Sequence, residues 1–119
     1  MNLNRLIDQI KKHPDFHKVG MILCHGGVVR GTSRSGKKVR GLTVSVDYAK
    51  LGRVIETHKK RKGIVEILVD INSGKPLYVG DDIMMLVVAG DIRDNVIPTL
   101  NDALNAIKST VTEKEEYLA

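Results

Sequence analysis

The chain has 119 residues, a formal net charge of +5 and 42% hydrophobic residues, which fits one globular domain and excludes a disordered or fibrous protein. A single cysteine, Cys24, excludes a scaffold held by internal disulfides and favours a reducing compartment, so we expect a cytoplasmic protein. We expect neither a secretory signal nor a membrane span, because no apolar run is long enough.

The basic residues are concentrated in the first half of the chain. Residues 1–62 carry 15 Lys and Arg against 4 Asp and Glu, whereas residues 63–119 carry 4 against 10. This asymmetry favours contact with an anion such as a phosphate, a nucleotide, a carboxylate or a membrane surface. The alternative is that these side chains form a solvated basic surface.

Hydrophobic periodicity and turn residues predict four segments in the first half. They are a short N-terminal helix with its lead-in over 1–18, capped by Asn2 or Asn4, a strand over 19–30, a basic loop over 31–38, and a strand over 42–46.

The same signals in the second half of the sequence predict the long elements of the fold. They are a helix over 48–62 with Asp47 as N-cap and Gly63 as C-cap, strands over 64–71 and 83–89, a second long helix ending near 107, and a polar tail over 109–119. This order predicts a single α+β domain over 1–119, with two long helices on a mostly antiparallel sheet. A core of this size would gain from homodimerisation.

Three motifs lack the neighbouring residues or secondary structure that their chemistry requires. Gly31 to Lys38 resembles the start of a phosphate-binding P-loop, but Lys38 replaces the hydroxyl residue and a strand follows instead of a helix. His13 and His17 lack a third ligand at metal-binding spacing, so we expect no metal and no cofactor. Cys24 and His25 are adjacent in a strand and point to opposite faces, which disfavours a catalytic dyad and makes Cys24 a small core residue.

Four isolated cations remain, three at the ends of predicted elements and one in the polar tail, six residues after the last helix ends. They are Arg30, Arg93, Lys108 and Lys114. Brought to one end of a sheet, they would hold a phosphate or carboxylate through charge-assisted hydrogen bonds. Few aromatics accompany them, so stacking on nucleic-acid bases is not favoured.

The same segments resemble the MoaE family, the large subunit of molybdopterin synthase, from about residue 20 to residue 117. The family's Gly-apolar-apolar strand leading into G-K-V-R is matched by Gly20-Met-Ile-Leu and Gly27-Val-Val-Arg30. Its turn before the buried strand is matched over Gly74 to Asp82, and its closing apolar-Lys pair by Ile107-Lys108.

The resemblance implies an α/β-hammerhead-like fold, a homodimer and a heterotetramer with a ubiquitin-like small subunit. It further implies sulfur transfer from the C-terminal thiocarboxylate of that subunit to cyclic pyranopterin monophosphate, which forms the dithiolene of molybdopterin. Lys108 and Lys114 would be catalytic, and Arg30 and Arg93 would bind substrate.

The sequence departs from the family pattern at three places. Ile92 replaces the histidine of the S-A-H-R motif, Thr112-Glu-Lys114-Glu replaces an aromatic-rich segment, and Val46-Asp47-Tyr48 is a reduced form of E-H-Y. The alternative interpretation is therefore a non-catalytic homologue that binds an anionic ligand, a ubiquitin-like tail or nucleic acid.

Overall fold

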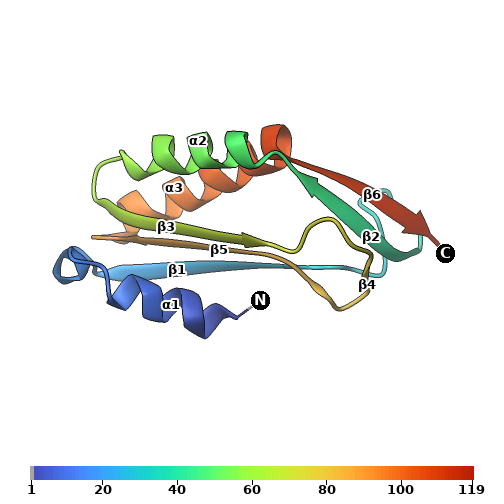
Figure 1. Cartoon of the computed structure of the whole chain (residues 1–119), viewed down its shortest axis with the longest axis horizontal. Coiled ribbons are helices and arrows are strands. Elements are labelled where there is room, and N and C mark those ends of the chain that lie inside the picture. The colour runs from blue at the N-terminus through green and yellow to red at the C-terminus, as the bar shows by residue number, and fades with distance from the viewer. Residues whose placement is uncertain (1) are drawn as a thin grey trace.

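A computed structural model describes residues 2–119 and has the mixed α+β fold that the sequence predicts (Figure 1). The helices are α1 (Leu3–Lys11), α2 (Tyr48–Lys59) and α3 (Arg93–Ala106), with a 3-10 turn at Phe16–Lys18 and a π-helical turn at Ile107–Val111. The strands are β1 (Met21–Val28), β2 (Val39–Val46), β3 (Ile64–Ile71), β4 (Leu77–Tyr78), β5 (Asp82–Gly90) and β6 (Thr112–Leu118). Within the described residues, no helix is both long and apolar enough to cross a membrane.

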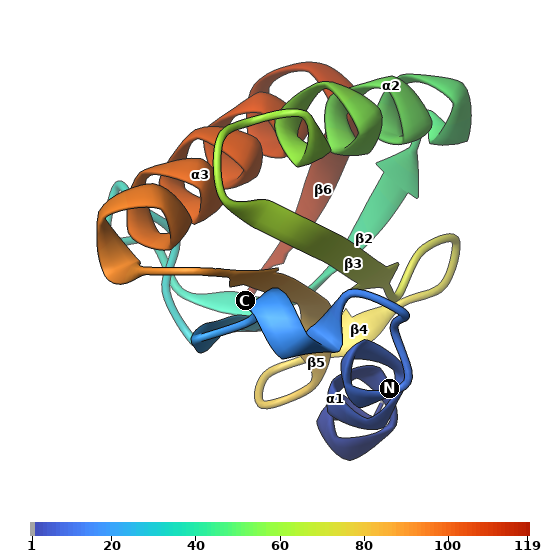
Figure 2. The same ribbon diagram turned by 90° about the vertical axis from the view of Figure 1, so that its left-hand side faces the viewer.

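The first sheet has the strand order β1-β5-β3, and both pairings are antiparallel. The central strand β5 is covered on both faces, by α2 and α3 on one side and by α1 on the other (Figure 2). Leu86 and Val88 therefore join the core under the two long helices, whereas Val87 and Ala89 pack against Ile10 of α1. Burial on both faces explains why β5 is a continuous apolar run instead of an alternating one.

The capping residues expected from the sequence hold the helix N-termini. The side chain of Asn2 accepts a hydrogen bond from the Arg5 amide at the start of α1. Asp47 accepts one from the Lys50 amide, at 3.0 Å, at the start of α2. These bonds satisfy amide groups that the helix itself leaves unpaired.

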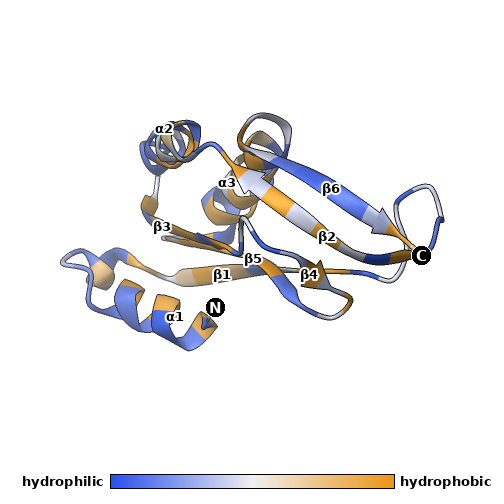
Figure 3. Cartoon of the chain, turned by 45° about the vertical axis from the view of Figure 1, so that its right-hand side comes forward, coloured by the Kyte–Doolittle hydropathy of each residue, from blue (hydrophilic) through white to orange (hydrophobic). Residues whose placement is uncertain are grey.

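The second sheet has the order β4-β2-β6 and extends from one end of the first sheet, which gives the molecule its length of 48 Å (Figures 1 and 3). The strands therefore form two three-stranded sheets and not the one sheet expected from the sequence. Residues 112–118, expected as part of a polar tail, pair with β2 along its whole length, from Val46–Thr112 to Val39–Leu118. The segment is mostly hydrophilic (Figure 3), so backbone pairing rather than an apolar face makes it a strand.

Candidate anion-binding pocket

Arg30 lies where the chain leaves the first sheet. The preceding residue, Val29, is 2% exposed and packs in the core of the second sheet with Leu42 and Leu77. The Arg30 side chain is exposed, and its Nε donates a hydrogen bond to the Thr32 carbonyl oxygen at 3.0 Å. Anchoring of Val29 therefore fixes the backbone from which this guanidinium extends.

The basic loop over 31–38 is a hydrogen-bonded hairpin between β1 and β2. The Gly36 amide donates to the Ser33 carbonyl at 3.0 Å, and the Ser33 amide donates to the Lys37 carbonyl at 2.8 Å. Gly36 has φ of +87°, which favours glycine at this position of the turn. Arg34 is thus the first central residue of a tight turn, and the chain continues into a strand, which is incompatible with a P-loop.

Lys108 is carried by the π-helical turn that follows α3. Ile107 and Val111, at the two ends of this turn, are buried in the main core. The hydroxyls of Ser109 and Thr110 donate to the carbonyls of Asn105 and Ala106, at 2.8 and 2.7 Å. The two buried ends fix the turn and leave Lys108 on its exposed side; such turns are frequent at functional sites.

Lys114 is positioned by the register of β6 against β2, in which it lies opposite Val44. Alternate residues of a strand share one face. Thr112, Lys114 and Glu116 accordingly face the space between the sheets, where all three line cavities.

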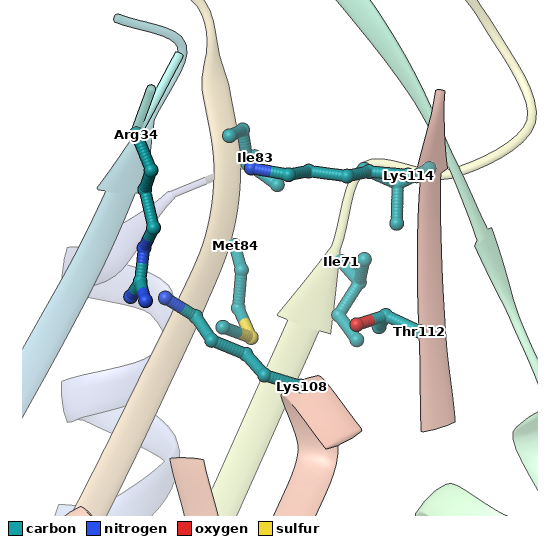
Figure 4. Close-up of a pocket in the computed structure, with 8 residues that line it drawn as sticks. Arg34, Ile71, Ile83, Met84, Lys108, Thr112 and Lys114 are labelled. Atoms are coloured by element: carbon teal, nitrogen blue, oxygen red, sulfur yellow. The ribbon is translucent and has the colours of Figure 1, made fainter. Parts of the chain in front are cut away.

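Two adjoining cavities share several of these side chains, and Figure 4 shows residues that line the first of them. The inner one, about 380 Å³, has mostly apolar walls that include Val44, Ile71, Ile83 and Met84. The outer one, about 320 Å³, is lined by Arg30, Arg34, Lys108, Lys114, His25 and Glu116 among others. Arg34, Ile83, Met84, Lys108 and Lys114 line both. We call the two together the cationic pocket.

The charges of the cationic pocket are uncompensated. Glu116 is the single carboxylate among the described residues that line it, so four cations leave a formal charge of +3 while His25 is neutral. None of the ion pairs formed within residues 2–119 includes Arg30, Arg34, Lys108 or Lys114. Convergent cations without carboxylate partners make a site for an anion, and the apolar inner wall suits the body of an organic anion.

His25 belongs to the pocket wall, although it is not among the site residues predicted from the sequence. Burial, and then the positive charge of Lys108, lower the pKa of its imidazole. Its Nε2 is buried without a hydrogen-bond partner. A glycine at position 27, two residues further along the same face of β1, leaves room for the ring; a Cβ there would lie 3.7 Å from Nε2.

Cys24 lies on the opposite face of β1 from His25, as strand geometry predicts, but it is exposed and is not the core residue that we expected. The reason is that α1 covers only part of this face of the first sheet, around Ile22. Partial burial raises the pKa of the Cys24 thiol, which disfavours a nucleophilic thiolate at neutral pH.

Arg93 does not lie in the cationic pocket of its own chain. It is the exposed first residue of α3, just beyond the end of β5 where Gly90 pairs with Met21. Arg30 follows the opposite end of the same strand pair, where Val28 pairs with Asp82. Eight residues of strand separate these ends, or about 23 Å. Ile92, next to Arg93, is 54% exposed.

Comparison with known proteins agrees with this architecture. The structure is similar to molybdopterin cofactor biosynthesis protein E from Burkholderia multivorans, with a TM-score of 0.78 and 21% identity over 100% of this chain and 82% of that one. It is also similar to molybdopterin synthase from Staphylococcus aureus, with a TM-score of 0.73 and 21% identity over 86% and 77% of the two chains. A complex of subunits 1 and 2 of molybdopterin-converting factor from Helicobacter pylori gives a TM-score of 0.72 and 16% identity over 100% and 84%.

Comparison with curated protein sequences gave no match. At the level of whole families, the model of the MoaE protein family matches residues 1–110. This range holds both long helices, the first five strands and all but the last residue of the π-helical turn, Lys108 included. The match covers most of the sequence and the structural likeness extends over the whole fold, so the chain belongs to the MoaE family.

Proposed function

We propose that this MoaE-family protein is the catalytic subunit of a molybdopterin synthase. Family membership supports a role in molybdenum cofactor biosynthesis. The finer proposal is sulfur transfer from the C-terminal thiocarboxylate of a ubiquitin-like small subunit to cyclic pyranopterin monophosphate. The observation that carries it is the convergence of Arg30, Lys108 and Lys114 on one pocket with a net positive lining and an apolar inner wall.

The chemistry requires two anions to meet. The thiocarboxylate sulfur attacks a pterin carbon and displaces an oxygen substituent, which forms a carbon–sulfur bond and a thioester between tail and pterin. Water then cleaves the acyl–sulfur bond, so the tail leaves as a carboxylate and the sulfur stays on the pterin. Two tails supply the two sulfur atoms of the dithiolene, and no cysteine of the large subunit is needed.

The lysines and Arg30 would have distinct roles in these steps. The ammonium of Lys108 would stabilise the oxyanion that develops on the acyl carbonyl oxygen during hydrolysis. Lys114, on the facing strand β6, would assist proton transfer, and Arg30 would bind the anionic group of the pterin. Arg93 would act in this pocket only if a second copy of the chain supplied it, which fits the expected homodimer.

The test is reconstitution with a thiocarboxylated small subunit and cyclic pyranopterin monophosphate, with molybdopterin measured by mass spectrometry. We expect product from the wild type, and a loss of about 100-fold or more in Lys108→Ala, the size observed when one preorganised transition-state donor is removed. Lys60→Ala is the matched control, because Lys60, the residue after α2, lines neither cavity of the pocket. Absence of product from active components would refute the enzymatic proposal.

A second candidate is a binding protein without turnover. It is favoured by Ile92, which lacks the imidazole of the family motif, and by the position of Arg93 far from Lys108. Binding of the small-subunit tail with no molybdopterin formed would support this function. A steep salt dependence of duplex binding would instead indicate nucleic acid.

A further inference from the structure

The hairpin over 31–38 presents one of its three cations to the cationic pocket and leaves the other two outside. Arg34 lines both cavities, whereas Lys37 and Lys38 line neither. The turn that begins at Ser33 and is closed at Gly36 places Arg34 at its tip. The position of the Arg34 side chain therefore follows from the turn geometry and is distinct from the general basicity of the loop.

Arg34 approaches another cation, and neither of the two forms an ion pair within the described residues. Its guanidinium extends toward the ammonium of Lys108, while Lys114 reaches over Ile83 from the other side (Figure 4). Like charges in such an arrangement repel each other, and the repulsion is relieved when an anion binds between them. The three cations come from three separate elements, the hairpin, the π-helical turn and β6, so they surround the ligand position instead of lying along one edge.

We propose that Arg34 is a specificity-determining residue that binds the phosphate group of the ligand at the mouth of the cationic pocket. This inference rests on the proposed function and adds Arg34 of the hairpin to Arg30 as a residue that binds the phosphate-bearing part of the substrate. A planar guanidinium binds two phosphate oxygens at once, and a tetrahedral phosphate has further oxygens for the neighbouring cations. A single carboxylate, with one charge and two oxygens in a plane, leaves most of the +3 charge of the lining uncompensated.

The experiment compares two probes that share a ring and differ in the anionic group, phenyl phosphate and benzoate. Their dissociation constants are measured by NMR titration at low and moderate salt for the wild type, Arg34→Gln, Arg34→Lys and Lys37→Gln. Lys37→Gln is the matched control, because it removes the same charge from the same hairpin outside the pocket. Gly36→Val is a second probe of geometry, because it keeps Arg34 but disfavours the φ of +87° that shapes the turn.

We expect the wild type to bind phenyl phosphate more tightly than benzoate. Arg34→Gln should weaken phenyl phosphate binding about tenfold and benzoate binding by less than about twofold, the loss expected of a charge-assisted contact at an exposed site. Arg34→Lys and Gly36→Val should give intermediate losses, and Lys37→Gln should stay within about twofold of the wild type.

Wild-type affinity for phenyl phosphate in Arg34→Gln would overturn the assignment. An equal loss in Arg34→Gln and Lys37→Gln would also overturn it, because long-range attraction rather than contact would then explain the effect. A wild type that binds neither probe would overturn the anion pocket itself. A wild type that binds phenyl phosphate through Arg34 but forms no molybdopterin in reconstitution would support this inference and refute the proposed function.

Discussion

His25 is a histidine whose surroundings favour the neutral imidazole. The pKa of its side chain is lowered by burial and by Lys108, and Arg30, Arg34, Lys114 and Glu116 are the other charged groups that line the same cavity. Its opposite neighbour on β5, Leu86, is apolar and fully buried. A neutral ring adds no charge to the pocket, so, among the described residues that line it, the four cations are the positive groups that face an anion at neutral pH.

This lowered pKa predicts a contribution of His25 to the pH dependence of stability. Because the folded-state pKa lies below the unfolded value of about 6.5, the unfolded chain binds more protons as pH falls through that value. The free energy of unfolding of the wild type should therefore decrease from pH 7 to pH 5. The same quantity should decrease less in His25→Phe. Urea denaturation at both pH values measures the difference.

His17→Gln provides the comparison, because His17 is an exposed histidine in the 3-10 turn. The unfolding free energy of His17→Gln should keep the wild-type decrease from pH 7 to pH 5, because this substitution leaves His25 and the groups around it in place. Added phosphate should raise the pKa of His25 toward its ordinary value by offsetting the charge of Lys108, which NMR titration of the imidazole would detect. The same pH dependence in His25→Phe as in the wild type would contradict the prediction.

Two pocket residues were not selected from the sequence, although each has a local signal. Arg34 lies between Ser33 and Gly36, a spacing typical of a tight turn that presents its central side chains. Because the same loop carries two further cations, charge alone does not distinguish Arg34 from them. The neighbouring Cys24 suggests only a dyad for His25, whereas the glycine two residues later indicates room on the face that carries His25. The sequence predicts Arg30 and Lys108 as site residues because each lies at an element whose end could be placed, whereas Lys114 follows Lys108 by six residues in a segment expected as a polar tail.

At the scale of elements, the second sheet depends on close approach of β4 to β2. A Cβ at Gly41 would collide with the carbonyl oxygen of Leu77 in β4, so only glycine fits there without movement of the backbone. We predict that Gly41→Ala lowers the free energy of unfolding by about 1–3 kcal/mol. Chemical denaturation measures this change.

Gly52→Ala is the matched control, since Gly52 lies within α2 with open space around its Cα. This substitution should raise stability by about 0.5–1 kcal/mol, because glycine is a poor helix former. Equal effects of the two substitutions would show that the approach of β4 to β2 does not constrain position 41.

Strand β6 is an element that the sequence does not predict. Its exposed and half-exposed residues have no apolar alternation, and its partner β2 is distant in the sequence; Thr43 and Tyr117, whose hydroxyls hydrogen bond across the pair, are 74 residues apart. The register of β6 against β2 decides whether Lys114 lines the pocket. A shift of one residue would turn Lys114 away from the pocket and bring a glutamate to the same face.

At the scale of the whole molecule, the two predicted arginines lie at opposite ends of the β1–β5 pair. The sequence placed both after strands, but β1 and β5 are antiparallel, so their C-terminal ends point in opposite directions. Antiparallel pairing is a property of the complete fold, and no local motif around Arg30 or Arg93 reveals it. Within one chain, the geometry therefore places three of the four predicted cations at one pocket and leaves Arg93 outside it.

If a second copy of the chain supplies Arg93 to this pocket, two inactive variants should complement each other. Arg93→Ala and Lys108→Ala would each be inactive as homodimers, whereas a mixed dimer would hold one intact site. After denaturation and joint refolding of equal amounts, half of the dimers would be mixed, so about a quarter of the wild-type rate of molybdopterin formation should return. Lys108→Ala mixed with Lys114→Ala should recover nothing, because both residues lie in the pocket of the same chain and every site lacks one of them. No recovery in the first mixture, with wild-type activity restored by the same refolding procedure, would exclude Arg93 from the partner's pocket.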